Sequence, residues 1–151
     1  MATVYVNDGL NPSAQTPGNR LESYDLGGKI RMATLKYTAP ATGMPQIADV
    51  LVWIPNLPKG ARIIPHMTKL YWSAGTASST LTLGDSATAN RYLTATAITS
   101  AGSAVAETGA ANGATYVTGT NSGDTVLTST VAGAQIAASQ VITLCVAYVQ
   151  D

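Results

Sequence analysis

Apolar and polar residues alternate in short segments along most of this chain, and turn residues separate the segments. Residues 79–85 alternate cleanly, residues 29–38 alternate less perfectly, and residues 140–149 form another such run. Alternation with a period of two places successive side chains on opposite faces of a β-strand, and no segment gives a clear helical pattern. Roughly eight to ten short antiparallel strands predict an all-β fold, either a jelly roll or a β-sandwich.

Other segments are predicted strands because of their composition. Residues 49–54 form a nearly continuous apolar run, which is typical of a strand buried on both faces. Residues 62–72 are interrupted by Pro65, which requires a bulge or an edge position. Residues 3–6, 116–118 and 125–128 complete the predicted set, whereas residues 97–113 give no assignment.

The length of the chain bounds its organisation. A chain of 151 residues suits one domain, so we expect a single β domain over residues 1–151. Residues 7–28 contain two prolines and lack periodicity, which predicts an extended arm within that domain or, alternatively, an ordinary surface loop. The residues of the arm expected to contact another chain are Leu10, Pro12, Pro17, Arg20, Leu21 and Tyr24.

The chain is poor in charge. Charged residues make up 11% of the sequence and the formal net charge is zero, against roughly 25% charged residues in an ordinary soluble domain. Only four of them, Asp85, Arg91, Glu107 and Asp124, lie in residues 74–135. Because little charge keeps copies apart, the composition favours a permanent assembly, with the chain as a homo-oligomer, either a dimer or a trimer.

Several functional classes lack their characteristic residues. With His66 as the one histidine and Cys145 as the one cysteine, general-base catalysis and a four-ligand zinc site are not expected, and no loop pairs two carboxylates for calcium. No glycine-rich phosphate loop indicates a nucleotide, and the scattered cations do not indicate nucleic acid. No apolar run has the length of a membrane helix, and the first residues lack a signal peptide. We therefore expect no enzymatic activity, no cofactor, no metal, no direct nucleic acid contact and no membrane contact.

The aromatic residues leave a binding function open. Trp53, Tyr71 and Trp72 could form a stacking platform for sugar, as in carbohydrate-binding modules. However, Trp53 lies in the most apolar run, and consecutive residues of a strand point to opposite faces. Packing in the core is the favoured interpretation of this trio.

Two segments resemble short motifs of small structural proteins of tailed bacteriophages. One is residues 57–64, which begin with the turn sequence Leu-Pro-Lys-Gly-Ala-Arg, and the other is residues 81–95, which contain Gly84-Asp85 and Arg91-Tyr92-Leu93. The likeness covers roughly residues 50–100 and a C-terminal strand that ends in an apolar-Ala-Tyr-Val pattern. Within it, Gly84, Asp85, Arg91 and Tyr92 are candidate structural residues, and we expect Arg91 to form a charge-assisted hydrogen bond with Asp85.

The resemblance implies a capsid decoration, or cement, protein. Such a protein binds the outside of an assembled phage head and stabilises contacts between major capsid subunits, so the expected partner is the major capsid protein. Its expected location is the outer surface of the head in the virion, after synthesis in the host cytoplasm. A tail-associated or fibre protein and a carbohydrate-binding adhesin module remain as alternatives.

Overall fold

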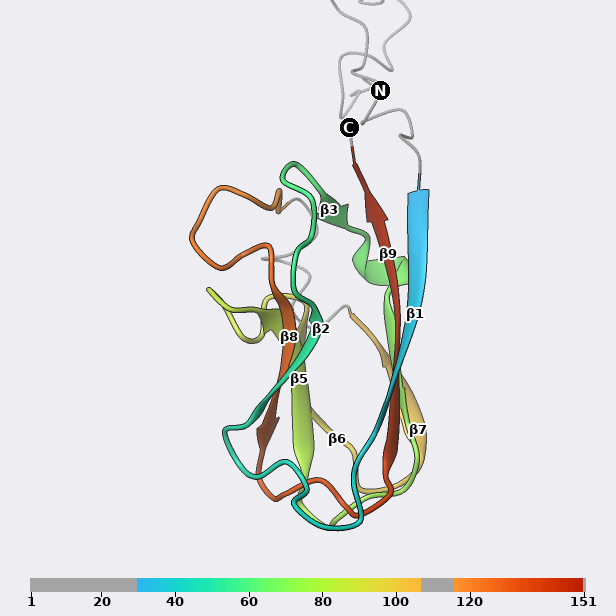
Figure 1. The fold of residues 1–151 in the computed structure, drawn as a ribbon. Helices are drawn as coiled ribbons and strands as arrows, with labels where there is room; N and C mark the ends of the chain where they lie inside the picture. The colour runs from blue at the N-terminus through green and yellow to red at the C-terminus, as the bar shows by residue number, and fades with distance from the viewer. Residues whose placement is uncertain (1–29, 107–115, 151) are drawn as a thin grey trace, which may run out of the picture.

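The computed structural model describes residues 30–106 and 116–150. Within them, nine strands and one 3-10 turn follow one another along the chain (Figure 1). The strands are β1 (Ile30–Thr38), β2 (Val50–Ile54), β3 (Arg62–Ile63), β4 (Lys69–Trp72), β5 (Thr80–Asp85), β6 (Leu93–Ala97), β7 (Gly102–Val105), β8 (Leu127–Ala132) and β9 (Val141–Val149), and the turn η2 spans Pro65–Met67. All strand pairs are antiparallel, so the expected all-β fold is confirmed. The predicted strand at residues 3–6 and the predicted arm at residues 7–28 lie outside the described residues.

The strands form two layers that face each other (Figure 1). A five-stranded sheet contains β1, β9, β4 and β7 in that order, and its fifth strand, β3, also pairs with β9, near the C-terminal end of β9. A four-stranded sheet has the order β2-β8-β5-β6. Along the chain the strands pass repeatedly from one layer to the other, so each sheet combines segments that are distant in sequence. The arrangement is a β-sandwich, one of the two expected architectures.

The hydrophobic core lies between the sheets. Leu81 and Leu83 of β5 and Leu144 of β9 are completely buried, as alternation predicts for the inward face. Trp53 and Trp72 are also buried, and both indole groups are satisfied: Trp53 Nε1 donates to Ser129 Oγ at 2.8 Å, and Trp72 Nε1 donates to the Ser100 carbonyl at 2.7 Å. Core packing of the two tryptophans is therefore confirmed.

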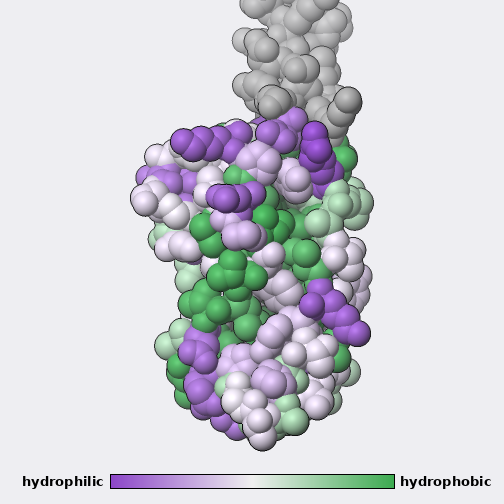
Figure 2. All heavy atoms as spheres, in the orientation of Figure 1, coloured by the Kyte–Doolittle hydropathy of each residue, from purple (hydrophilic) through white to green (hydrophobic). Residues whose placement is uncertain are grey.

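Strand β2 differs from the prediction. Its apolar run predicted burial on both faces, but Val50 and Val52 are 52% and 55% exposed, because β2 is an edge strand and the outer face of its sheet is uncovered among the described residues. The pairing with β8 also shifts between Val52 and Ile54, which marks a bulge. Figure 2 shows apolar side chains gathered on the side of the molecule between β1 and β2, which are edge strands of the two sheets.

Three further segments show where local sequence signals fail. Residues 62–72 are two strands separated by η2, and Pro65 occupies the first turn of η2, where its missing N–H costs little. Residues 116–118 were predicted to be a strand, but they belong to a loop. The unassigned region contains β7, whose Gly102 is opposite Trp72 of β4.

Gln140, the residue directly before β9, joins the two sheets at one end of the sandwich. Its Nε2 donates to the carbonyls of Ser73 and Ile98, both at 3.0 Å, and its Oε1 accepts from the Ala137 N–H at 3.2 Å. Ser73 follows β4 in one sheet, and Ile98 follows β6 in the other. Gly75 makes room for this amide, since a Cβ there would lie 2.3 Å from Gln140 Nε2.

We predict that Gln140→Ala lowers the free energy of unfolding by about 3 kcal/mol, because the change leaves buried carbonyls without donors. Urea denaturation measures the loss. Gln46→Ala is the matched control, because Gln46 is exposed and its Nε2 donates to the nearby Met44 carbonyl at 2.7 Å; its cost should stay within about 0.5 kcal/mol. Equal losses for the two variants would contradict a joining role for Gln140.

Candidate functional site

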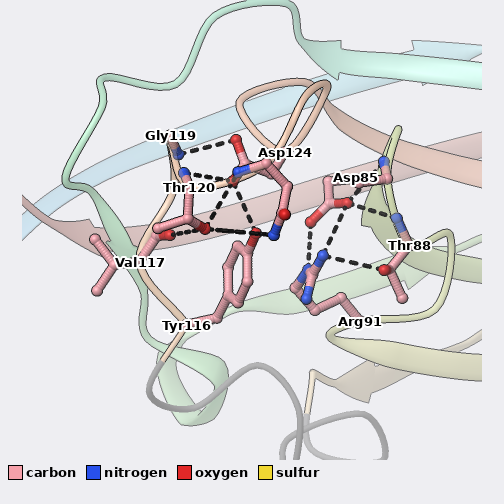
Figure 3. Close-up of polar contacts among 10 residues, drawn as sticks. Asp85, Thr88, Arg91, Tyr116, Val117, Gly119, Thr120 and Asp124 are labelled. Carbon is pink, nitrogen blue, oxygen red and sulfur yellow. Dashed lines mark hydrogen bonds and ion pairs between the residues drawn. The ribbon is translucent and has the colours of Figure 1, made fainter.

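The two segments that carry the phage resemblance meet a third segment at one end of the sandwich. Residues 57–61 form the turn before β3, and residues 86–92 connect β5 to β6. Both contact the loop of residues 116–126, which leads into β8. We call the four interacting side chains Asp85, Arg91, Tyr116 and Asp124 the polar joint (Figure 3).

Asp85 organises the connection between β5 and β6. Its Oδ1 accepts the N–H groups of Ala87 at 2.9 Å and Thr88 at 2.7 Å, so the carboxylate closes the turn that follows β5. Its Oδ2 accepts from Arg91 Nε, and Arg91 Nη2 donates to Thr88 Oγ1 at 3.0 Å. The predicted Asp85–Arg91 bond is confirmed, and the pair is almost completely buried.

Gly84 is required by the same turn. A Cβ at Gly84 would lie 2.2 Å from the Thr88 carbonyl oxygen and 2.4 Å from the Ala89 carbonyl carbon, which are backbone atoms that cannot move aside independently. The loop folds back directly over this position. Glycine is therefore needed for close approach of the backbone.

Arg91 connects this turn to the loop that precedes β8. The guanidinium carbon lies 3.6 Å from the centre of the Tyr116 ring, a cation–π contact with a planar group that also binds Asp85. Burial alone would lower the pKa of Arg91, but the hydrogen bond and the charge of Asp85 outweigh burial and raise it. The arginine therefore stays charged between a carboxylate and an aromatic ring.

Asp124 closes the loop at the other side of Tyr116. Its carboxylate accepts the N–H groups of Gly119 at 2.9 Å, Thr120 at 3.0 Å and Asn121 at 2.8 Å, and the Tyr116 hydroxyl donates to Oδ2 at 2.7 Å. Burial alone would raise the pKa of Asp124, but these hydrogen bonds outweigh it and lower the pKa to about 2. The buried carboxylate therefore stays ionised at neutral pH.

The loop of residues 116–126 is also bonded to the turn before β3. Thr118 Oγ1 donates to the Pro58 carbonyl at 2.7 Å, and the Thr118 N–H donates to the Ala61 carbonyl at 2.9 Å. The Gly60 N–H returns a bond to the Thr118 carbonyl at 2.9 Å. Through this loop, the two motifs of the resemblance become parts of one structural unit.

Tyr92 lies beside the joint and is completely buried. Among the described residues, its hydroxyl has no hydrogen-bond partner. Burial, with the nearby Asp85 charge, raises the pKa of the hydroxyl, so Tyr92 remains neutral. Its ring belongs to the hydrophobic core, so Tyr92 attaches the joint to that core.

The joint holds backbone in place, and its charged groups are all bound by other groups of the protein. Both carboxylates already accept several donors, and the cation is paired and stacked. In the described ranges, no group of three or more His, Cys, Asp or Glu residues is placed to hold a metal ion, and no helix is long and apolar enough to cross a membrane. The arrangement is suited to fixing three loops relative to one another.

The other candidate residues are dispersed or lie elsewhere. His66 lies in the exposed turn η2 rather than in a strand, and Cys145 is half-buried on β9, with its Sγ 3.7 Å from Thr34 Oγ1. Of the aromatic trio, only Tyr71 is exposed. The arm residues Leu10, Pro12, Pro17, Arg20, Leu21 and Tyr24 lie outside the described residues.

Sequence reasoning identified half of the joint and missed the other half. Asp85 and Arg91 are close in sequence on either side of a turn, so their pairing could be predicted. Asp124 was not among the candidate site residues, and Tyr116 was missed because residues 116–118 were predicted to be a strand. The Asn-Ser-Gly-Asp sequence at residues 121–124 was the available signal, since Asp and Asn next to Gly are typical of side chains that bind the backbone of a turn.

We predict that Asp124→Asn destabilises the protein by about 2 kcal/mol at neutral pH, and that this difference disappears in acid. The folded-state pKa is about 2, below the unfolded value near 4, so the carboxylate stabilises the fold above about pH 4 and stops doing so as the pH falls through 2. Urea midpoints measured from neutral pH downward test this. Asp49→Asn is the control, because Asp49 is exposed and accepts one hydrogen bond, from the Gln46 N–H at 2.7 Å. A difference that persists unchanged at low pH would contradict the assignment.

Comparison with known proteins gives one informative likeness. No family model matches the sequence, and no curated protein sequence matches it. Among solved structures, a chain described as "Cyanophage Pam1 capsid asymmetric unit" is similar, with a TM-score of 0.63 and 22% sequence identity. The similarity covers 93% of this chain and 99% of that chain, so the two proteins share a fold over nearly their whole lengths.

Proposed function

We propose that this chain is a structural protein of a bacteriophage head that binds the outside of the shell and stabilises contacts between major capsid subunits. The observation that carries the proposal is the end-to-end likeness to a chain from a phage capsid asymmetric unit. The capsid description of that neighbour and the two phage-like motifs point to the same class of particle.

The geometry of the chain is consistent with a static role. The polar joint uses its charged groups to close loops, and the aromatic residues that a sugar platform would need are mostly inside the core. We therefore propose that the protein has no enzymatic activity and works by binding alone. A protein that binds only the assembled shell stabilises it by mass action, and the effect accumulates over many equivalent sites.

A tail-associated or fibre protein is the second candidate for a structural role. The neighbour's description as part of a capsid favours the head over the tail. The carbohydrate-binding alternative is weakened, because only Tyr71 of the aromatic trio is available on the surface.

The head proposal predicts that heads assembled without this chain release their DNA at a lower temperature, and that adding the purified protein restores the temperature measured for complete heads. Electron microscopy of the restored heads should show added density at symmetry-related positions on the outer surface. Bovine serum albumin added at the same concentration controls for nonspecific protection. Heads equally robust without the chain, or density confined to the tail or the interior, would contradict the proposal.

The isolated protein should be a discrete homo-oligomer, either a dimer or a trimer, at micromolar concentration. The physical reason is that neutral surface with few charges gives little repulsion between copies, and a closed oligomer can engage neighbouring capsid subunits together. Sedimentation velocity measures the state. A strictly monomeric protein would contradict the predicted homo-oligomer, whereas binding to heads is tested by the preceding experiment.

A further inference from the structure

The outer surface of the five-stranded sheet carries exposed apolar side chains. On β1, Ile30 and Met32 are 50% and 65% exposed, and on β4, Tyr71 is 43% exposed. Leu144 of β9 points into the core, and side chains alternate along each strand, so the register places these three on the surface that faces away from the four-stranded sheet. This surface forms one broad side of the sandwich (Figure 1).

Three cations share that surface with the apolar side chains. Lys36 of β1 and Tyr71 of β4 lie in one row across the sheet, because both are opposite Thr143 of β9. Lys69 Nζ lies 5.0 Å from the centre of the Tyr71 ring, and Arg62 of β3 marks the end of the surface where β9 finishes. None of the carboxylates in the described ranges lies on these strands.

The outer surface of the four-stranded sheet is chemically different. Val50 and Val52 are exposed there beside threonines such as Thr82 and Thr130, which are linked by a hydrogen bond of 3.2 Å from the Thr130 N–H to Thr82 Oγ1. The described strands of that sheet place no charged side chain on its outer side. Positive charge is therefore concentrated on one of the two broad sides.

We propose that the surface formed by Ile30, Met32, Lys36, Arg62, Lys69 and Tyr71, the basic-apolar face, docks against an acidic protein surface on the outside of the capsid. The proposal rests on the function proposed above and names the side of this chain that meets the shell. Its partner surface carries carboxylates around apolar side chains. Those carboxylates pair with the lysines and the arginine, while Met32 and Tyr71 are buried against the apolar part.

Charge complementarity selects this partner. Exposed methionine, tyrosine and arginine are enriched in the cores of protein interfaces, whereas DNA binding depends on neutralising many phosphates. Three cations around an apolar centre fit the first description. From strand geometry the face measures about 20 Å by 15 Å, so the area that one copy can bury is smaller than the roughly 800 Å² that each partner buries in a typical interface. An oligomer that presents several such faces would bind more tightly through multivalency.

The first arm of the test removes charge from the face. Lys36→Gln/Lys69→Gln should weaken binding to heads assembled without this chain by about tenfold, with a smaller loss of affinity in high salt than the wild type shows. The control is Ala95→Glu/Ala97→Glu, which changes the net charge equally at exposed positions of β6 in the other sheet. Co-sedimentation with heads at increasing protein concentration measures the affinities, and urea denaturation verifies that both variants are folded.

The second arm uses the chain's single cysteine as a probe. Cys145 is half-buried at the centre of the face, between Thr34 of β1 and Lys69 of β4. Its modification by N-ethylmaleimide should slow by at least about tenfold when the protein is bound to heads. Cys145→Ala/Val52→Cys carries the thiol on the opposite sheet, and its reactivity should be the same in the bound and free protein.

The outcomes separate this inference from the proposed function. If the wild-type protein does not bind heads, both the proposed function and the docking face are wrong. If it binds, but the lysine variant binds as tightly as the control or Cys145 remains fully reactive, only the docking face is wrong. Cys145 already protected in the free oligomer would assign the face to contact between copies, and displacement of the protein from heads by a short DNA duplex would assign it to polyanion binding; either result overturns the proposal.

Discussion

The buried ion pair between Asp85 and Arg91 is the interaction on which one end of the sandwich depends. Removing two charges from water is costly, and the attraction between them compensates only when their remaining hydrogen-bonding groups are also satisfied. Here the Ala87 and Thr88 N–H groups donate hydrogen bonds to the Asp85 carboxylate, while the Tyr116 ring packs against the Arg91 guanidinium. Tyr116 in turn donates to Asp124, so the pair extends into a network that reaches three loops.

The network explains the unusual charge distribution of the chain. Of the four charged residues in positions 74–135, the three that the structure describes, Asp85, Arg91 and Asp124, all belong to the polar joint. They are withdrawn from the surface, so this half of the sequence contributes almost no exposed charge in the described ranges. The exposed or half-buried cations come instead from β1, β3, β4 and the turn before β3, and this leaves the two broad sides of the sandwich electrostatically unlike.

The sequence predicted what depends on local alternation and failed where tertiary contacts decide. Strands β1, β5 and β9 agree closely with their predicted ranges, because period-two alternation directly reports a half-buried strand. Strand β7 was missed, since Gly-Ser-Ala-Val at residues 102–105 has weak strand propensity and its place is fixed by pairing with β4. The exposure of Val50 and Val52 was missed because an apolar run does not reveal whether another layer covers it.

The charged residues that stabilise the fold and those proposed to bind a partner lie in different parts of the molecule. The polar joint lies at the end of β5 and in the loop before β8, two strands of the four-stranded sheet. The basic-apolar face lies on the outer side of the five-stranded sheet, and the hydrophobic core lies between the two sheets. Residues that determine the fold are thus separate from residues available for docking. Evolution could alter Met32 or Lys36 to follow a changing partner without disturbing Asp85 or Asp124, because sites without shared contacts contribute nearly independently to stability. A β-sandwich closed by buried hydrogen bonds can in this way keep one shape while its exposed face is adapted to a particular partner.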